Sequence, residues 1–328
     1  MAHQTEIVVN GQTVEVTEFD HTAQEIDDGI TNLSTITGGA TTPQAALNAL
    51  GAGVRPNLLD NAIFIGGGSQ QGGGQLPVNQ RGQTSYTAQG GIFDRWKFYY
   101  TAGCTGKIDL LAEGIQVTTT GGSQISDYTN FQQALYTTID TSKEICVSVI
   151  VDGVLHQSCG KIPVTVPLGG ANRAELHSNE FRFILLSGST YKIQAVKVEY
   201  GTTQTLAYQD DTGAWQLLPQ PESDYATQLA KCQRYLIPIG ANSCWGLAES
   251  NTTAYLYLPL PVSMRTTPVF QGNLPPTLWP GGNSVTSISV FSPSAIENMI
   301  TLQVDGTGFV ARNVYSLNQP IGFLSAEL

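Results

Sequence analysis

Residues 144–156 read EICVSVIVDGVLH. Asp152-Gly153, a dipeptide favoured in two-residue hairpin turns, separates the apolar run 146–151 from a second run at 154–156. This pattern predicts two antiparallel strands joined by a tight turn. Further short runs, with Gly, Asp, Asn and Ser between them, predict strands at residues 93–100, 107–111, 114–119, 161–166, 181–186 and 191–200. Strands this short and regularly spaced indicate a mainly β chain, with a jelly-roll β-sandwich over residues 57–218.

A single helical pattern follows the predicted sandwich. Tyr225, Leu229 and Cys232 recur at spacings of four and three, which predicts a helix over residues 223–234, and Pro219 and Pro221 precede it. Strands are then expected at residues 235–237, 254–258, 285–291, 299–304 and 309–314, with a turn at Asp305-Gly306. Residues 219–328 are therefore expected to form a small C-terminal β-sandwich led by a linker helix.

The first 56 residues have a different pattern. Asn10-Gly11 predicts a hairpin within residues 5–16, and helices are predicted over residues 22–33 and 43–50. Ile26, Ile30 and Leu33 would share one side of the first helix, and so short a segment cannot bury that stripe by itself. Two interpretations stay open: a simple N-terminal appendage, or a module that attaches the chain to a larger assembly.

The composition excludes several classes of function. The 328 residues carry a formal net charge of −11, and the 15 basic residues are scattered, whereas a nucleic-acid partner requires clustered Lys and Arg. Only 12% of residues are charged, against ~25% in an ordinary soluble domain, and Thr, Ser, Asn and Gln replace them. No run of 18 apolar residues exists, so membrane insertion is not expected, and the start of the chain does not resemble a secretory signal.

The cysteines show neither an even count nor a CxxC spacing. The five are Cys104, Cys146, Cys159, Cys232 and Cys244. A disulfide framework or a zinc site of the usual pattern is therefore not expected. The sequence predicts five free thiols in a chain made in a reducing cytoplasm.

No catalytic or cofactor motif is present. GxSxG and HExxH are absent, and the glycine-rich run 66–74 fits neither GxGxxG nor the Walker pattern, so it is interpreted as a loop. A cysteine nucleophile with a distant His stays open, as does a calcium site at Asp210-Asp211, although an ordinary acidic loop is favoured there. Asp27-Asp28 is interpreted as solvated. We expect no enzyme activity, no cofactor and no metal.

Three tryptophans are candidates for ligand contact. Trp215, Trp245 and Trp279 lie in loop-like contexts, and exposed aromatic faces stack on the apolar faces of sugars. A buried plug in a loop or a contact between subunits is nevertheless favoured for each of them. Trp96, by contrast, lies in a predicted strand with Phe98 on the same face, which is typical of a core residue.

Several segments resemble an opening shared by bacteriophage and prophage tail-fibre or receptor-binding proteins of phages that infect Firmicutes and other gut bacteria. Residues 57–61 (NLLDN), 77–83 (PVNQRGQ) and 94–96 (DRW) carry the resemblance. Four further segments are similar to later parts of such proteins, namely residues 42–51, 197–201, 229–235 and 259–268. These segments occur in the expected order and cover most of the chain.

The resemblance implies a virion protein, made in the host cytoplasm, with a jelly roll akin to carbohydrate-binding modules. It also implies a homotrimer that attaches by residues 1–56 to other virion proteins of the tail, baseplate or capsid, and that recognises a bacterial cell-surface glycan without cleaving it. The alternative is a purely structural virion component, such as a head fibre, a decoration protein or a tail-tip protein. A depolymerase is disfavoured, because the chain lacks the length and repeat of a long β-helix.

Overall fold

The computed structural model describes residues 3–9, 12–18, 54–65, 77–122, 126–135, 137–210, 212–220, 224–272, 278–293 and 299–327. It is mainly β, with 53% of residues in strands and 4% in helix, which confirms the predicted fold class. The predicted helices at 22–33 and 43–50, with Ile26, Ile30 and Leu33, lie outside the described residues, as do Asp27-Asp28 and the run 66–74.

Contacts divide the chain into two units. The first comprises Met1–Val54 and Ala207–Pro219, and the second Arg55–Leu206 and Gln220–Leu328. In the first unit, β1 (His3–Val9) pairs antiparallel with β2 (Gln12–Glu18), from His3↔Glu18 to Val9↔Gln12. This pairing confirms the predicted N-terminal hairpin. Strand β15 (Ala207–Gln209) forms a separate hairpin with β16 (Trp215–Leu217).

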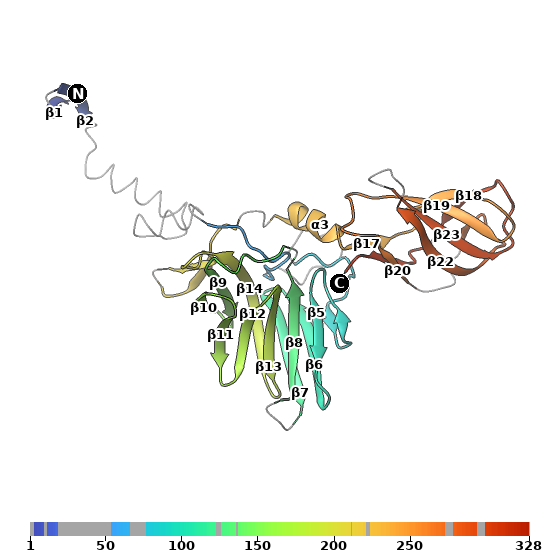
Figure 1. The fold of residues 1–328 in the computed structure, drawn as a ribbon, viewed down its shortest axis with the longest axis horizontal. Helices are drawn as coiled ribbons and strands as arrows, with labels where there is room; N and C mark the ends of the chain where they lie inside the picture. Colours follow the sequence, from blue (N-terminus) through green and yellow to red (C-terminus); the bar gives the residue numbers. More distant parts are fainter. Residues whose placement is uncertain are drawn as a thin grey trace. The chain divides into compact units, whose positions relative to one another are not determined.

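The first part of the second unit is an antiparallel β-sandwich, coloured light blue to yellow in Figure 1. One sheet has the order β10-β9-β14-β7-β6-β3 and the other β11-β12-β13-β8-β5-β4. The chain passes repeatedly from one sheet to the other, as expected for the predicted jelly-roll class. The strands are β3 (Ser85–Tyr86), β4 (Gly90–Gly91), β5 (Lys97–Tyr100), β6 (Cys104–Leu111), β7 (Gly114–Gly121), β8 (Tyr128–Ala134), β9 (Ile145–Val151), β10 (Val154–Gly160), β11 (Val164–Gly169), β12 (Asn172–His177), β13 (Glu180–Leu186) and β14 (Thr190–Tyr200).

Aromatic side chains fill the core of this sandwich. Trp96 is fully buried, as predicted, and its ring stacks on Phe131 with the ring centroids 4.3 Å apart. The indole N–H of Trp96 donates to the carbonyl oxygen of Asn61 at 2.9 Å, so the one polar atom of the buried ring is satisfied. The predicted strand at 93–100 begins only at Lys97, because Arg95 has a φ of 74° and Trp96 N–H donates to Phe93 O in a turn.

Cys146 and Cys159 form a disulfide, so the prediction of five free thiols is wrong. The two residues are direct partners across the hairpin of β9 and β10, with their Cα atoms 4.0 Å apart. They lie at equal distances from the two-residue turn at Asp152-Gly153, which brings their side chains together. Cys104, Cys232 and Cys244 are free and buried.

The second part of this unit begins with helix α3 (Tyr225–Gln233), as predicted. Asp224 caps it, accepting a hydrogen bond from Thr227 N at 2.9 Å. Two antiparallel sheets then share one core, in the orders β17-β25-β20 and β21-β24-β18-β19-β23-β22 (Figure 1). Their strands are β17 (Leu236–Ile239), β18 (Trp245–Ala248), β19 (Thr253–Pro259), β20 (Val269–Gly272), β21 (Leu278–Trp279), β22 (Ser284–Pro293), β23 (Met299–Thr307), β24 (Val314–Leu317) and β25 (Gly322–Ser325).

Two predictions in this region are wrong. Asp305-Gly306 does not form a turn, because both residues lie inside β23 and pair with β22. Gly306 is required there for close approach, since a Cβ atom would lie 2.1 Å from the carbonyl oxygen of Ser284. The turn instead follows at residues 310–313, where Asn313 N donates to Val310 O at 3.0 Å, so residues 309–313 precede β24 rather than forming a strand.

Candidate functional site

Two of the three candidate tryptophans lie close together on one sheet. Strand β24 lies between β21 and β18, and its residue Ser316 is the direct partner of both Trp279 and Trp245. Directly opposed residues of antiparallel strands point to the same face of a sheet. The three side chains therefore form one line across the strands.

This face is the outer one. Along β18, Trp245 and Leu247 are exposed, whereas Gly246 and Ala248 are buried, and the alternation places the two large side chains away from the core. Trp245 is 59% exposed and Trp279 is 67% exposed. These values exclude the interpretation of either residue as a buried plug.

The line continues across the next two strands. Tyr257 in β19 is the direct partner of Trp245, and Thr301 in β23 is the partner of Tyr257. The rings of Trp245 and Tyr257 meet edge to face, with centroids 6.2 Å apart. We call the set Trp279, Ser316, Trp245, Tyr257 and Thr301 the tryptophan row.

A second row of outward-facing residues runs beside the first. Val314, Leu247, Tyr255 and Gln303 are successive partners across β24, β18, β19 and β23. Phe291 of β22, which is 58% exposed, packs against Tyr255 with ring centroids 4.9 Å apart. Because exposed apolar patches are common at binding surfaces, this face is the candidate site.

The face has almost no charge. Within the described strands of this sheet, Asp305 is the only charged residue. It accepts hydrogen bonds from Thr253 Oγ1 at 3.3 Å, Ser287 Oγ at 3.1 Å and Gln303 Nε2 at 3.0 Å. Desolvation, followed by the nearby Glu249 carboxylate, raises the pKa of Tyr255. The described strands of this sheet therefore offer aromatic stacking with hydroxyl and amide hydrogen bonds, and they contain no Lys or Arg.

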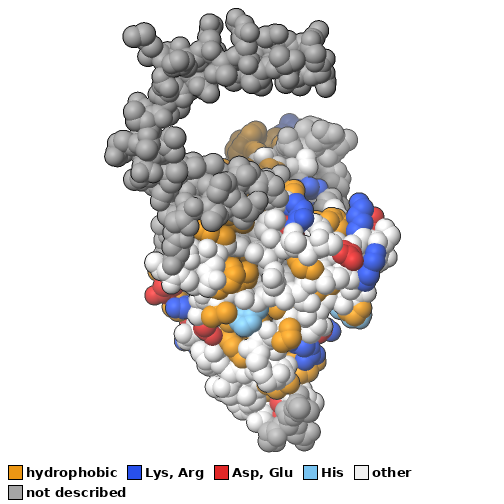
Figure 2. Space-filling model, turned by 90° about the vertical axis from the view of Figure 1, so that its left-hand side faces the viewer, with side chains coloured by type: hydrophobic (Ala, Val, Ile, Leu, Met, Phe, Trp, Pro, Cys, Tyr) orange, Lys and Arg blue, Asp and Glu red, His pale blue; other side chains and the backbone are white. Residues whose placement is uncertain are grey.

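Charged side chains are also sparse elsewhere. On the face of the molecule drawn in Figure 2, uncharged polar side chains and backbone cover most of the described surface, and the charged groups are small and separate.

Trp215 begins β16, in the other unit of the chain, and is half-buried. The structure therefore brings Trp245 and Trp279 together on one sheet, whereas Trp215 lies on a different hairpin.

The three segments that carry the family resemblance meet in a buried polar cluster. Asn61 Nδ2 donates to Val78 O and to Asp94 O, each at 2.9 Å. The carboxylate of Asp94 is fully buried and accepts from the backbone N and the Nε2 of Gln80, each at 2.6 Å. Burial raises the pKa of Asp94 to about 6, against the lowering effect of these hydrogen bonds.

The same cluster joins the first sandwich to the residues that follow α3. Gln80 Nε2 donates to Leu236 O at 2.9 Å, and the Arg95 guanidinium lies 3.6 Å from the ring centroid of Tyr235. Arg81 forms an ion pair with Glu327. A hollow of about 800 Å³ beside this junction is lined by Arg81 and by residues of α3, β17, β20 and β25. These contacts explain the three motifs as a structural junction within the second unit.

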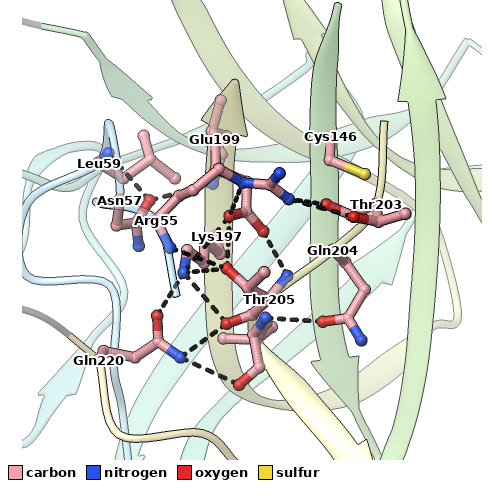
Figure 3. A network of polar contacts seen from close by, with 12 residues as sticks. Arg55, Asn57, Leu59, Cys146, Lys197, Glu199, Thr203, Gln204, Thr205 and Gln220 are labelled. Atoms are coloured by element: carbon pink, nitrogen blue, oxygen red, sulfur yellow. Dashed lines mark hydrogen bonds and ion pairs between the residues drawn. The ribbon is translucent and has the colours of Figure 1, made fainter. Parts of the chain in front are cut away.

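A second buried polar cluster surrounds Lys197, which lies on β14 (Figure 3). Lys197 Nζ donates to Thr205 O at 3.1 Å, Thr205 Oγ1 at 2.8 Å and Gln220 Oε1 at 2.7 Å. Glu199 is 3.6 Å from Lys197 Nζ and also accepts from Arg55 Nε at 3.0 Å. Burial lowers the pKa of Lys197 to about 8. Because its three protons have partners, the ammonium group is a structural element and not a free ligand.

The remaining candidates for chemistry have structural explanations. Burial raises the pKa of Cys232 well above its ordinary value and that of Cys244 to about 12, so neither is an activated nucleophile. Asp210 accepts from Thr212 N, Thr212 Oγ1 and Ala214 N in its own loop.

In the part of the chain that the structure describes, no cluster of three His, Cys, Asp or Glu residues could hold a metal. Of the residues described, no helix is long and apolar enough to cross a membrane.

Sequence reasoning missed the partners of the two tryptophans. Tyr255 and Tyr257 alternate with buried Ala254, Leu256 and Leu258 along β19, and this alternation was a readable signal for an exposed aromatic face. The position of Ser316 between the tryptophans had no such signal, because it depends on the order of the strands.

No family model, no curated protein and no solved structure matches this chain. The resemblance to phage fibre proteins therefore remains a prediction from the sequence.

Proposed function

We propose that this chain is a non-enzymatic, homotrimeric receptor-binding fibre protein of a phage virion. Residues 1–56 attach it to other virion proteins, and the outer face of the six-stranded C-terminal sheet binds a bacterial surface glycan. The observation that carries the proposal is the tryptophan row, in which two exposed indoles flank a hydroxyl group across three adjacent strands. Aromatic faces supply stacking surfaces for sugar rings, and Ser, Thr and Gln side chains bind their hydroxyl groups.

The low charge of the face supports the same proposal. A partner rich in phosphate would require Lys or Arg, and the strands of this sheet contain neither in their described residues. A function outside the host cell also agrees with the disulfide between Cys146 and Cys159, since disulfides persist in oxidising surroundings.

The second candidate function is that of a structural virion component without a receptor. The exposed aliphatic side chains of Leu247 and Val314, 49% and 60% exposed, favour it, because apolar patches also form contacts between subunits. In that case the tryptophan row would be covered in the assembled oligomer.

Binding of fluorescently labelled, purified protein to host cells tests the proposal. We expect saturable binding that disappears when the wall polysaccharide is stripped enzymatically, and that is lost in Trp245→Ala. The matched control is Trp215→Ala, which removes the same side chain from a separate hairpin and should bind like the natural sequence. Binding that survives stripping, or no binding by a correctly assembled protein, would favour the structural role.

A further inference from the structure

The spacing of the tryptophans restricts the shape of the ligand. Neighbouring strands lie about 4.8 Å apart, so Trp279 and Trp245, separated by β24, are about 10 Å apart along a line that crosses the strands. Tyr257 extends the same line by one further strand. A ligand that contacts the whole row must be long, flat and directed across the strands.

An extended glycan with equatorial β-linkages has this form. Each pyranose ring advances the chain by nearly one strand spacing, and successive rings are turned over, so alternate rings present the same face to one side. Rings above Trp279 and Trp245 would then be next but one in the chain, and the ring between them would lie above Ser316, whose hydroxyl group can donate or accept. A coiled α-linked chain cannot place two coplanar rings in this line.

The charge of the face restricts the ligand further. Asp305, the one charged residue in the described strands of the sheet, would repel a phosphate or a uronate. The Glu249 carboxylate, which contributes to the raised pKa of Tyr255, would also repel an acidic ligand. The face therefore fits a chain without acidic groups.

We infer that the glycan bound by this site is an extended, uncharged, β-linked polysaccharide that lies across the strands, with alternate sugar rings stacked on Trp279 and Trp245. This inference rests on the proposed function, and it specifies the class of glycan and its direction.

Isothermal titration calorimetry on the full chain tests the inference with four probes: chitohexaose, chitobiose, isomaltohexaose and poly(glycerol phosphate). The β-linked hexaose should bind about tenfold more tightly than the disaccharide, because only the longer probe reaches both indoles. Trp279→Ala should reduce hexaose affinity about tenfold, to the level of the disaccharide, and leave disaccharide affinity unchanged. Trp215→Ala is the matched control and should keep the full dependence on length. Isomaltohexaose and poly(glycerol phosphate) should not bind.

Four results would overturn the inference. Tighter binding of isomaltohexaose or poly(glycerol phosphate), if abolished by Trp245→Ala, would contradict the class of glycan and leave the glycan-binding function intact. A length dependence that persists in Trp279→Ala would contradict the direction of the chain. Absence of binding to every probe would contradict the ligand class, while cell binding measures the proposed function separately. Loss of oligomeric mass in either tryptophan variant would identify the face as a subunit contact.

Discussion

Asp94 offers a quantitative test of the buried junction. Its carboxylate is fully buried, and burial raises its pKa from 3.8 to about 6. Between pH 4 and pH 6 the folded protein therefore holds a proton that the unfolded chain has released. The contribution of Asp94 to the free energy of unfolding must fall as pH rises through this range. At 1.36 kcal/mol per pKa unit, a shift of about two units corresponds to about 3 kcal/mol.

The variant Asp94→Asn removes this titration. Gln80 donates to both carboxylate oxygens of Asp94, whereas an Asn side chain has only one acceptor oxygen. The free energy of unfolding of the variant should therefore also fall by about 1–3 kcal/mol independently of pH. Urea unfolding, followed by the fluorescence of buried Trp96, should show that the natural chain loses about 3 kcal/mol relative to the variant between pH 4 and pH 7.

Asp210→Asn is the matched control for this experiment. Hydrogen bonds from Thr212 and Gln216 lower the pKa of Asp210 to about 2, so its stabilising effect is lost only as pH falls below 4. The control should keep the slope of the natural chain between pH 4 and pH 7. Equal slopes for the natural chain and Asp94→Asn would refute the reasoning about the junction.

Three further predictions concern the buried charges, the thiols and the assembly. Glu199→Gln leaves the buried Lys197 ammonium without its carboxylate, so the free energy of unfolding measured in urea should fall by about 3–5 kcal/mol. The control Asp109→Asn removes a partly exposed ion pair and should lower it by less than about 1 kcal/mol; equal losses would contradict this. Thiol titration of the denatured, unreduced protein should count three groups, and five only after reduction; five at the outset would disprove the disulfide. Light scattering in line with size exclusion should give a trimer of about 105 kDa, and a stable species of 35.0 kDa at micromolar concentration would contradict it.

Local patterns in the sequence were sufficient for much of the fold. The turn at Asp152-Gly153, the alternation in the strands of the first sandwich and the helix after Asp224 all depend on neighbouring residues, and the structure contains them. The strand β12 (Asn172–His177) was missed because Arg173 and Glu175 give it no apolar run. Glu175 forms an ion pair with Arg173 on the same strand and another with Arg182 on the neighbouring β13, a partner that only the folded sheet supplies.

The disulfide was within reach of the sequence and was not found. A two-residue turn at Asp152-Gly153 makes Cys146 and Cys159 direct partners, because Cys146 lies six positions before Asp152 and Cys159 lies six positions after Gly153. Neither the odd number of cysteines nor the absence of CxxC carries information on this register. The register of a predicted hairpin is therefore a better guide to pairing than the parity of the cysteine count.

The site was only partly predictable. The residue type and loop-like surroundings nominated Trp245 and Trp279, but also Trp215, which the structure leaves outside the row. The adjacency of β21, β24 and β18 follows from strand order and not from local sequence, since Trp279 follows Trp245 by 34 positions and Ser316 follows Trp279 by 37. Long-range pairing of this kind has no local signal.

The measurement that tests the central claim most directly is the binding of Trp245→Ala/Trp279→Ala to purified wall polysaccharide from the host. The natural chain, the double variant and Trp215→Ala would be compared by sedimentation with the polysaccharide, after light scattering has shown equal oligomeric mass. The account predicts that the natural chain and Trp215→Ala co-sediment with the polysaccharide and that the double variant stays in solution. Equal co-sedimentation of all three proteins would contradict a glycan-binding site on the tryptophan row.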